Sequence, residues 1–243
     1  MKYNFIRFPG GKTKAVTLSY DDGSQADIRF LEIINKYGLK CTFNLNSELL
    51  GTEFTLKVLG EDIDHIKVNK NDVKSIYSGH EVAAHTLTHP FLPELSSDEI
   101  VRQVETDRLN LSELVGYEVV GMAYPCGGEN SNEYVANTIK AATGIKYART
   151  IRETLSFKGY ENLHLFNPTF SLTKDTDKIE SITDAFFKND TDEVKLLYVW
   201  GHSYEFDAGN RWGILEDFCR NISGKDDVLY CTNKEAFEFL GII

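Results

Sequence analysis

The chain alternates short apolar segments with amphipathic ones, and this alternation restricts its fold more than any other feature. Residues 15–20 form an apolar, partly β-branched run that is typical of a buried strand. Residues 26–37 then carry apolar side chains at helical spacing up to Gly38, and residues 41–45 form the next apolar run. The order strand, helix, strand predicts a βαβ unit with parallel strands and a right-handed crossover.

The same alternation continues through the chain. Further strands are expected at residues 81–84, 118–123, 145–148, 195–200 and 228–231, and further helices at residues 71–77, 97–115, 132–142, 179–187, 211–219 and 234–240. Ser96 and Glu99 predict a capping box at the start of the helix at residues 97–115. Residues 51–68 do not follow the pattern and are predicted to be an insertion. Because no linker interrupts the chain, we expect one α/β domain over residues 1–243, with a parallel sheet that is open or closed into a barrel.

The composition of the chain limits which molecules the protein can bind and in which compartment we expect it. The net charge of −11 argues against binding nucleic acid or an anionic membrane through a basic surface. No stretch reaches the length of a membrane-spanning helix, and the first residues lack the apolar core of a signal peptide, so we expect a cytoplasmic protein. The four cysteines are widely spaced, which favours free thiols, although Cys219 and Cys231 could pair in an oxidising compartment.

Polar side chains follow several of the predicted strands at the point where each strand ends. Asp21 and Asp22 follow the first strand, His85 follows residues 81–84, and His202 follows residues 195–200. Functional residues gather at the carboxyl ends of parallel strands in both barrels and open sheets. The sequence therefore predicts a site at this edge.

Two short motifs indicate the chemistry of that site. Asp21 and Asp22 are adjacent and followed by Gly23, which fits either a solvent-exposed turn or two carboxylates that share a cation. His85 and His89 are four residues apart and could converge on one metal from a helical turn, although this spacing alone is often incidental. Two histidines and one aspartate suffice to hold a catalytic metal, and the second aspartate could take a proton from water. Together the motifs predict metal-assisted hydrolysis.

With these two motifs the chain resembles the polysaccharide deacetylase family, the NodB homology domain of carbohydrate esterase family 4. Residues 20–23 match the family's first motif, usually written TFDDG, and residues 79–89 match its second, with HxxxH in a GHE…HTxTH context. Residues 196–202 are similar to its last motif, an apolar strand that ends in histidine. The resemblance spans about residues 14–205. It implies a distorted (β/α) barrel and a hydrolase that removes an N-acetyl group from an amino sugar or oligosaccharide.

The resemblance also implies roles for matching residues. Asp22, His85 and His89 would bind a divalent metal ion, most commonly zinc. Asp21 would be the general base toward the attacking water, and His202 would protonate the leaving amine.

Residues 123–127 lie where the family has an Arg-x-Pro-Tyr-Gly segment, and they depart from it. The backbone N–H of Cys126, at the tyrosine position, would help to hold the oxyanion. Ala123 stands at the arginine position, so the cation that orients the base is missing there. Arg149, after the next strand, either supplies this charge or forms a surface ion pair.

The chain has no clear match to the family's Asp-x-x-Asp-Trp segment, which supports the terminal histidine. Glu205 or Asp207 could orient His202 through a ring N–H, unless they belong to a polar loop. Trp200 or Trp212 could wall the pocket, but burial preferences favour a core position for both.

Two other functions compete with removal of a sugar N-acetyl group. The departures at Ala123 and Cys126 leave room for a metal-dependent hydrolase of a small, non-polymeric amide, and the missing arginine also fits a carbohydrate-binding protein that has lost catalysis. His65, His80 and His164 have no partner pattern that indicates catalysis, and we expect them to be structural. Oligomeric state has no sequence signature here.

Overall fold

A computed structural model describes residues 7–158, 162–188 and 193–243. Within these ranges, eight strands form one parallel sheet in the order β7-β6-β5-β2-β1-β9-β8, and β10 pairs with the start of β1. These strands are β1 (Lys14–Asp21), β2 (Cys41–Leu45), β5 (Glu81–Ala84), β6 (Gly121–Ala123), β7 (Tyr147–Arg149), β8 (Phe170–Ser171), β9 (Lys195–Gly201) and β10 (Val228–Tyr230). The helices are α1 (Ala26–Lys36), α2 (Val73–Ile76), α3 (Ser97–Val115), α4 (Glu133–Ala142), α5 (Ile179–Phe187), α6 (Trp212–Ile222) and α7 (Asn233–Phe239).

The sheet curls into a distorted barrel, as predicted. β7 is four strands away from β1 in the sheet, a separation of about 19 Å if the sheet were flat. The guanidinium of Arg149 on β7 nevertheless lies 2.5 Å from the Asp21 carboxylate on β1. An isolated parallel bridge between Arg149 and Phe166 links β7 to the segment that leads into β8. The strand ends therefore surround a common space.

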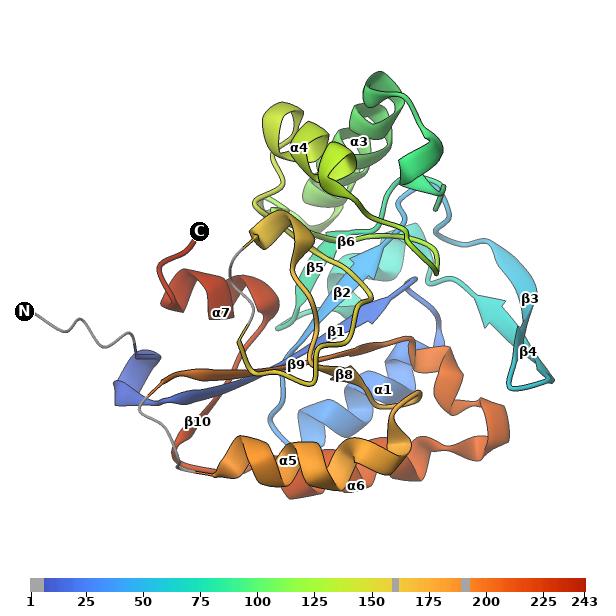
Figure 1. Ribbon diagram of the computed structural model, residues 1–243. Coiled ribbons are helices and arrows are strands. Elements are labelled where there is room, and N and C mark those ends of the chain that lie inside the picture. The colour runs from blue at the N-terminus through green and yellow to red at the C-terminus, as the bar shows by residue number, and fades with distance from the viewer. Residues whose placement is uncertain (1–6, 159–161, 189–192) are drawn as a thin grey trace, which may run out of the picture.

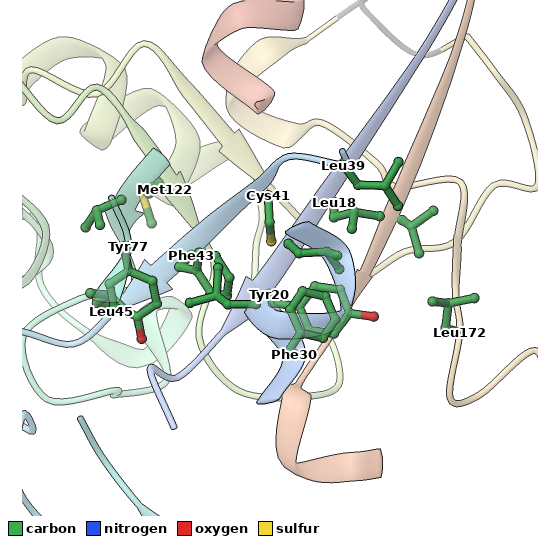
Figure 2. Packing of buried hydrophobic residues seen from close by; sticks show 14 of the residues in the cluster. Leu18, Tyr20, Phe30, Leu39, Cys41, Phe43, Leu45, Tyr77, Met122 and Leu172 are labelled. Atoms are coloured by element: carbon green, nitrogen blue, oxygen red, sulfur yellow. The ribbon is translucent and has the colours of Figure 1, made fainter. Parts of the chain in front are cut away.

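Helices cover the outside of this sheet. In Figure 1, α3 and α4 lie on one side of it, and α1, α5 and α6 lie on the other. Figure 2 shows Leu18 and Tyr20 of β1 among the buried side chains that include Phe30 of α1, whose ring centroid is 4.0 Å from that of Tyr20. Full burial of one such side chain contributes about 1.5–3 kcal/mol.

Every second residue of β1 from Thr17 onward faces the barrel interior, and these residues are polar. The Thr17 hydroxyl donates to Asn233 of α7, and the Asn233 amide donates to the Ser19 hydroxyl. Ser19 also accepts from Asn44. Asp21 is the next residue on this face, so the period of two along the strand delivers its carboxylate to the interior.

Residues 51–68, predicted to be an insertion, contain an antiparallel hairpin, β3 (Glu53–Val58) and β4 (Glu61–Ile66), which projects from the rest of the molecule in Figure 1. Leu59 and Gly60 make its turn with φ of 53° and 86°. Most side chains of the hairpin are exposed. Residues Glu53–Val58 nevertheless alternate polar and apolar side chains, which is a strand pattern, whereas Glu61–Ile66 contains three acidic residues and does not alternate. An insertion was predicted here, but both strands were missed.

Several predicted boundaries are wrong by a few residues. The strands expected from residues 118 and 145 begin at Gly121 and Tyr147, and the helix expected at residues 71–77 splits into a 3₁₀ turn and the short α2. Ser96 caps α3 by accepting from the Glu99 N–H, but the Glu99 carboxylate pairs with Arg102. This charge-assisted pair replaces the return bond of the predicted capping box.

All four cysteines are free thiols, so Cys219 and Cys231 do not pair. Across the described ranges, no helix is both long enough and apolar enough to cross a membrane. The cytoplasmic location stays a prediction.

Candidate functional site

The end of β1 directs two adjacent carboxylates into one cavity. Asp21 is the last strand residue, and Asp22 adopts a φ of 81°, which turns the chain so that its side chain also reaches the cavity. Gly23 follows with a φ of 64°, and a Cβ there would lie 2.7 Å from Leu45 Cδ2. Neighbouring residues on a regular strand would point to opposite faces, so this turn is what brings both carboxylates together.

His85 and His89 converge from an irregular loop, so the helical turn expected for them is wrong. Thr86 and His89 have φ of 70° and 60°, in the left-handed region that residues other than glycine seldom adopt and that is least favourable for a β-branched residue such as Thr86. The Asn46 amide donates to the carbonyls of His85 and Thr86, at 2.6 and 2.9 Å. The Gln103 carbonyl accepts from the Leu87 N–H. These long-range bonds hold a strained conformation that local sequence does not indicate.

Asp21 is held by groups from two other strands. Arg149 Nη2 lies 2.5 Å from both carboxylate oxygens, and Asn44 donates to Oδ1 at 2.8 Å. Burial alone would raise the pKa of Asp21, but Arg149, His85 and His202 outweigh it and lower the pKa below its ordinary value. Arg149 is fully buried, so the alternative of a surface ion pair is wrong. Arg149 on β7 pairs in register with Ala123 on β6, which stands at the position where the resemblance implied an arginine. The cation therefore comes from the neighbouring strand.

Asp22 and the two histidines form a cluster of possible metal ligands. One ligand atom from each of these three residues lies within 4.8 Å of the others. Asp22 Oδ1 is 4.0 Å from His85 Nε2 and 3.8 Å from His89 Nε2. Burial would raise the pKa of Asp22, but Lys67 and the surrounding histidines hold it well below its ordinary value.

Both imidazoles of this cluster favour the neutral form that binds metals. Burial lowers the pKa of His85 to about 4 and also lowers the pKa of His89. His85 Nδ1 lies 2.9 Å from the carbonyl oxygen of Ala123, which fixes the proton on Nδ1 and leaves the Nε2 lone pair facing Asp22. A deprotonated carboxylate and two neutral imidazoles are a donor set that fits a divalent metal ion.

His202 lies opposite this cluster and, unlike His85 and His89, favours the protonated form. Its Nε2 is 4.0 Å from Asp21 Oδ2 and 3.8 Å from Asp22 Oδ2, while its Nδ1 is 3.2 Å from Glu205 Oε1. Burial opposes its protonation, but Glu205 and the two aspartates outweigh burial and raise the pKa of His202 to about 9. Of the two acidic residues considered for orienting His202, Glu205 contacts it, whereas Asp207 accepts a bond from Trp212.

The cavity between these groups has a volume of about 230 Å³. Cys126 borders it, and the backbone N–H of this residue points to His89 Nε2 at 3.4 Å. Trp200 also lines the cavity, and the Arg149 guanidinium and the Lys174 ammonium both lie over its ring, 4.9 and 4.2 Å from the ring centroid. Trp212 packs on Phe206 in the core instead.

Two residues that contact Asp22 were missed by sequence reasoning. The buried Lys67 ammonium donates to the Asp22 carbonyl and carboxylate, and the Tyr204 hydroxyl donates to Asp22 Oδ2 at 3.2 Å. His65 is fully buried and packs edge-to-face on Tyr204, and its ring nitrogens have no hydrogen-bond partner within the described residues. Lys67 and His65 come from the insertion, where no motif indicated a site.

His80 and His164 are structural, as predicted. His80 bonds to Asn35, and His164 bonds to the carbonyl of Ile145.

A sequence profile of the polysaccharide deacetylase family matches residues 9–148, more than half of this chain. The chain belongs to the polysaccharide deacetylase family. This profile includes both aspartates and both loop histidines, whereas Arg149 and His202 lie beyond it.

Individual deacetylases show the same relationship. A peptidoglycan-N-acetylglucosamine deacetylase of Bacillus cereus is 30% identical over 146 residues, which are 58% of this chain and 45% of that protein. The match thus spans less than half of that relative's length. A Pseudomonas aeruginosa structure described as a probable polysaccharide deacetylase has a TM-score of 0.67 at 12% identity, covering 97% of this chain and 92% of that one. A family 4 carbohydrate esterase from Streptomyces lividans, in complex with acetate, has a TM-score of 0.56 at 14% identity, covering 91% and 92%. These structures share the fold.

Proposed function

We propose that this chain is a divalent-metal-dependent deacetylase that hydrolyses the N-acetyl amide of an amino sugar within an oligosaccharide. The observation that carries the proposal is the cluster of Asp22, His85 and His89 beside Asp21 and His202, around one cavity. Membership of the polysaccharide deacetylase family supports the same reaction.

The donor set favours zinc as the metal. One carboxylate and two imidazoles, with room for a further ligand, are typical of catalytic zinc sites. When bound, the ion would polarise the amide carbonyl and increase the acidity of water in the cavity.

The chain's own residues would move the protons. Asp21 is ionised and clamped by Arg149, so its carboxylate is oriented to accept a proton from the attacking water. His202, whose pKa is raised to about 9, carries a proton on the opposite side and would donate it to the departing nitrogen. The Cys126 N–H donates to His89 Nε2, and with that nitrogen bound to the metal it would be released to stabilise the negative charge that develops on the carbonyl oxygen.

The surroundings of the cavity favour an oligosaccharide over a small amide. A second hollow of about 390 Å³ adjoins it, and Lys174 and Tyr204 line both. Leu56 and Lys57 of the hairpin form the far wall of this hollow. The two spaces together can hold the reacting sugar and a neighbouring sugar of the same oligosaccharide. Arg149 beside Asp21 also weakens the case for a binding protein without catalysis, because that case rested on the missing arginine.

The test measures zinc content and acetate release on the same purified sample, with chitin oligomers and free N-acetylglucosamine as substrates. Wild type should bind one equivalent of zinc and release acetate faster from the oligomers, and His85→Ala should lose both activities. His164→Ala is the matched control, because His164 is a similarly buried histidine away from the cavity. Zinc binding without acetate release on either substrate would refute the proposed reaction.

A further inference from the structure

Lys67, directly after β4, places a buried ammonium group on Asp22. The side chain of Lys67 is 2% exposed. Its Nζ lies 2.6 Å from the Asp22 carbonyl oxygen, 3.1 Å from Asp22 Oδ1 and 3.3 Å from Asn46 Oδ1. An ammonium group has three protons to donate, so these three acceptors match its full capacity.

The oxygen that contacts Lys67 is also the one that faces the imidazoles. Asp22 Oδ1 is 4.0 Å from His85 Nε2 and 3.8 Å from His89 Nε2. A divalent ion held by these residues would therefore share this carboxylate with the ammonium group. Two cations so close together in a buried site repel each other strongly, because little water screens them.

The backbone fixes Lys67 in this place. The Val68 N–H donates to the Gly23 carbonyl at 2.8 Å, and the Gln25 N–H donates to the Ile66 carbonyl at 2.7 Å. The end of the hairpin is thus joined directly to the turn that carries Asp22. Because the Asn46 amide is itself bonded to the His85 and Thr86 carbonyls, the third acceptor is also held in position.

With Lys67, each of the two adjacent carboxylates of the site has its own cation. Arg149 pairs with Asp21, and Lys67 pairs with Asp22. We propose that Lys67 is a resident counter-ion for Asp22, which stabilises the metal-free site and weakens the binding of a divalent ion. The proposal rests on the metal site of the proposed function, although it does not depend on the reaction.

Lys67→Met and Lys67→Gln test this inference. Both variants remove the charge, and glutamine keeps a donor for the Asp22 carbonyl, which protects folding. Thermal unfolding of the metal-free variants should shift down by about 5 °C or more, while the zinc Kd, measured against a chelator of known affinity, should tighten at least tenfold. Loss of a merely structural contact would instead loosen the site and weaken zinc binding.

Two controls separate charge from packing. Lys67→Arg keeps the charge and should keep the wild-type Kd within about threefold. Lys12→Met removes a lysine that bonds the Val228 carbonyl and should leave zinc affinity unchanged. Equal tightening in Lys67→Arg, or an unchanged or weaker Kd in Lys67→Gln, would overturn the role. Zinc binding with no acetate release would refute the proposed reaction but not the role of Lys67. Absence of zinc binding in both wild type and Lys67→Gln would refute the proposed reaction and the role of Lys67.

Discussion

Asp21 and Asp22 are neighbours in the chain, yet different parts of the molecule support them. The barrel itself holds Asp21, through Asn44 on β2 and Arg149 on β7. Asp22 is held from outside the barrel, by Lys67 after the hairpin and by Tyr204 after β9. The proposed base is therefore held by the main sheet, whereas the proposed metal ligand depends on the segment that contains the hairpin. Metal affinity could accordingly change without disturbing the position of the base.

Replacing each aspartate by asparagine tests this division most strongly. Asp22→Asn should weaken zinc binding at least 100-fold, because it removes the only charged ligand of the proposed set. Asp21→Asn should keep zinc affinity within about tenfold and lower the rate of acetate release by 10²–10⁴-fold, the usual contribution of general acid–base catalysis. Chelator competition and acetate assays measure both. An active, zinc-replete Asp21→Asn protein would refute the assignment of the base.

Arg149→Met breaks the support on the barrel side. It leaves the Asp21 carboxylate buried without its cation, and such uncompensated charges cost about 3–5 kcal/mol. The free energy of unfolding from urea titration should fall by that amount. Adding Asp21→Asn should restore part of it, because the charge that needed a partner is gone. A double variant no more stable than Arg149→Met would show that the cost comes from lost packing on Trp200.

Tyr204→Phe is a milder change on the side of Asp22. It removes the hydroxyl that donates to Asp22 Oδ2 but keeps the ring that packs on His65. We expect zinc affinity to weaken about tenfold, as for other residues that orient metal ligands, with a stability change of about 1 kcal/mol. Tyr230→Phe removes a hydroxyl bonded to the Ile222 carbonyl and serves as the control. Equal zinc affinity in the two variants would contradict the prediction.

His80 provides a reference remote from both carboxylates, with no expected effect on zinc affinity. Burial and Lys40 lower the pKa of His80 to about 4, whereas an unfolded histidine titrates near 6.5. Between these values the unfolded chain binds more protons, so the contribution of His80 to stability is complete above pH 6.5 and is lost as pH falls toward 4. His80→Gln should reduce the slope of the unfolding free energy against pH in this acidic range, by an amount that corresponds to up to one bound proton. Urea titrations at several pH values measure this slope. An unchanged slope would contradict the lowered pKa.

Much of the barrel could be predicted because its strands are buried runs bounded by clear helices. Figure 1 shows that β1, β2, β5 and β9 follow the alternation read from the sequence. The hairpin was missed although Glu53–Val58 alternates polar and apolar residues, because Glu61–Ile66 carries three acidic residues and no regular pattern that would pair with it.

The candidate site was predictable only where its residues lie in short motifs. Asp21, Asp22, His85 and His89 fall in two such motifs, and the structure gathers them at one cavity. Lys67 and Tyr204 act through contacts over 45 and 182 positions of chain, which no local pattern encodes. Arg149 was foreseen as one alternative, but only the curl of the sheet brings it to Asp21.

The long reach of these contacts has a consequence for synthesis of the protein. Asp21 and Asp22 leave the ribosome early, but Arg149 is made 128 residues after Asp21 and Tyr204 is made 182 residues after Asp22. At translation rates of about 5–20 residues per second, the two carboxylates wait roughly 10–35 s for Tyr204. During that interval β1 also lacks β9, its longest pairing partner. A nascent chain can thus assemble the hairpin and the histidine loop first, and the complete pocket closes only when the last third of the chain has been translated.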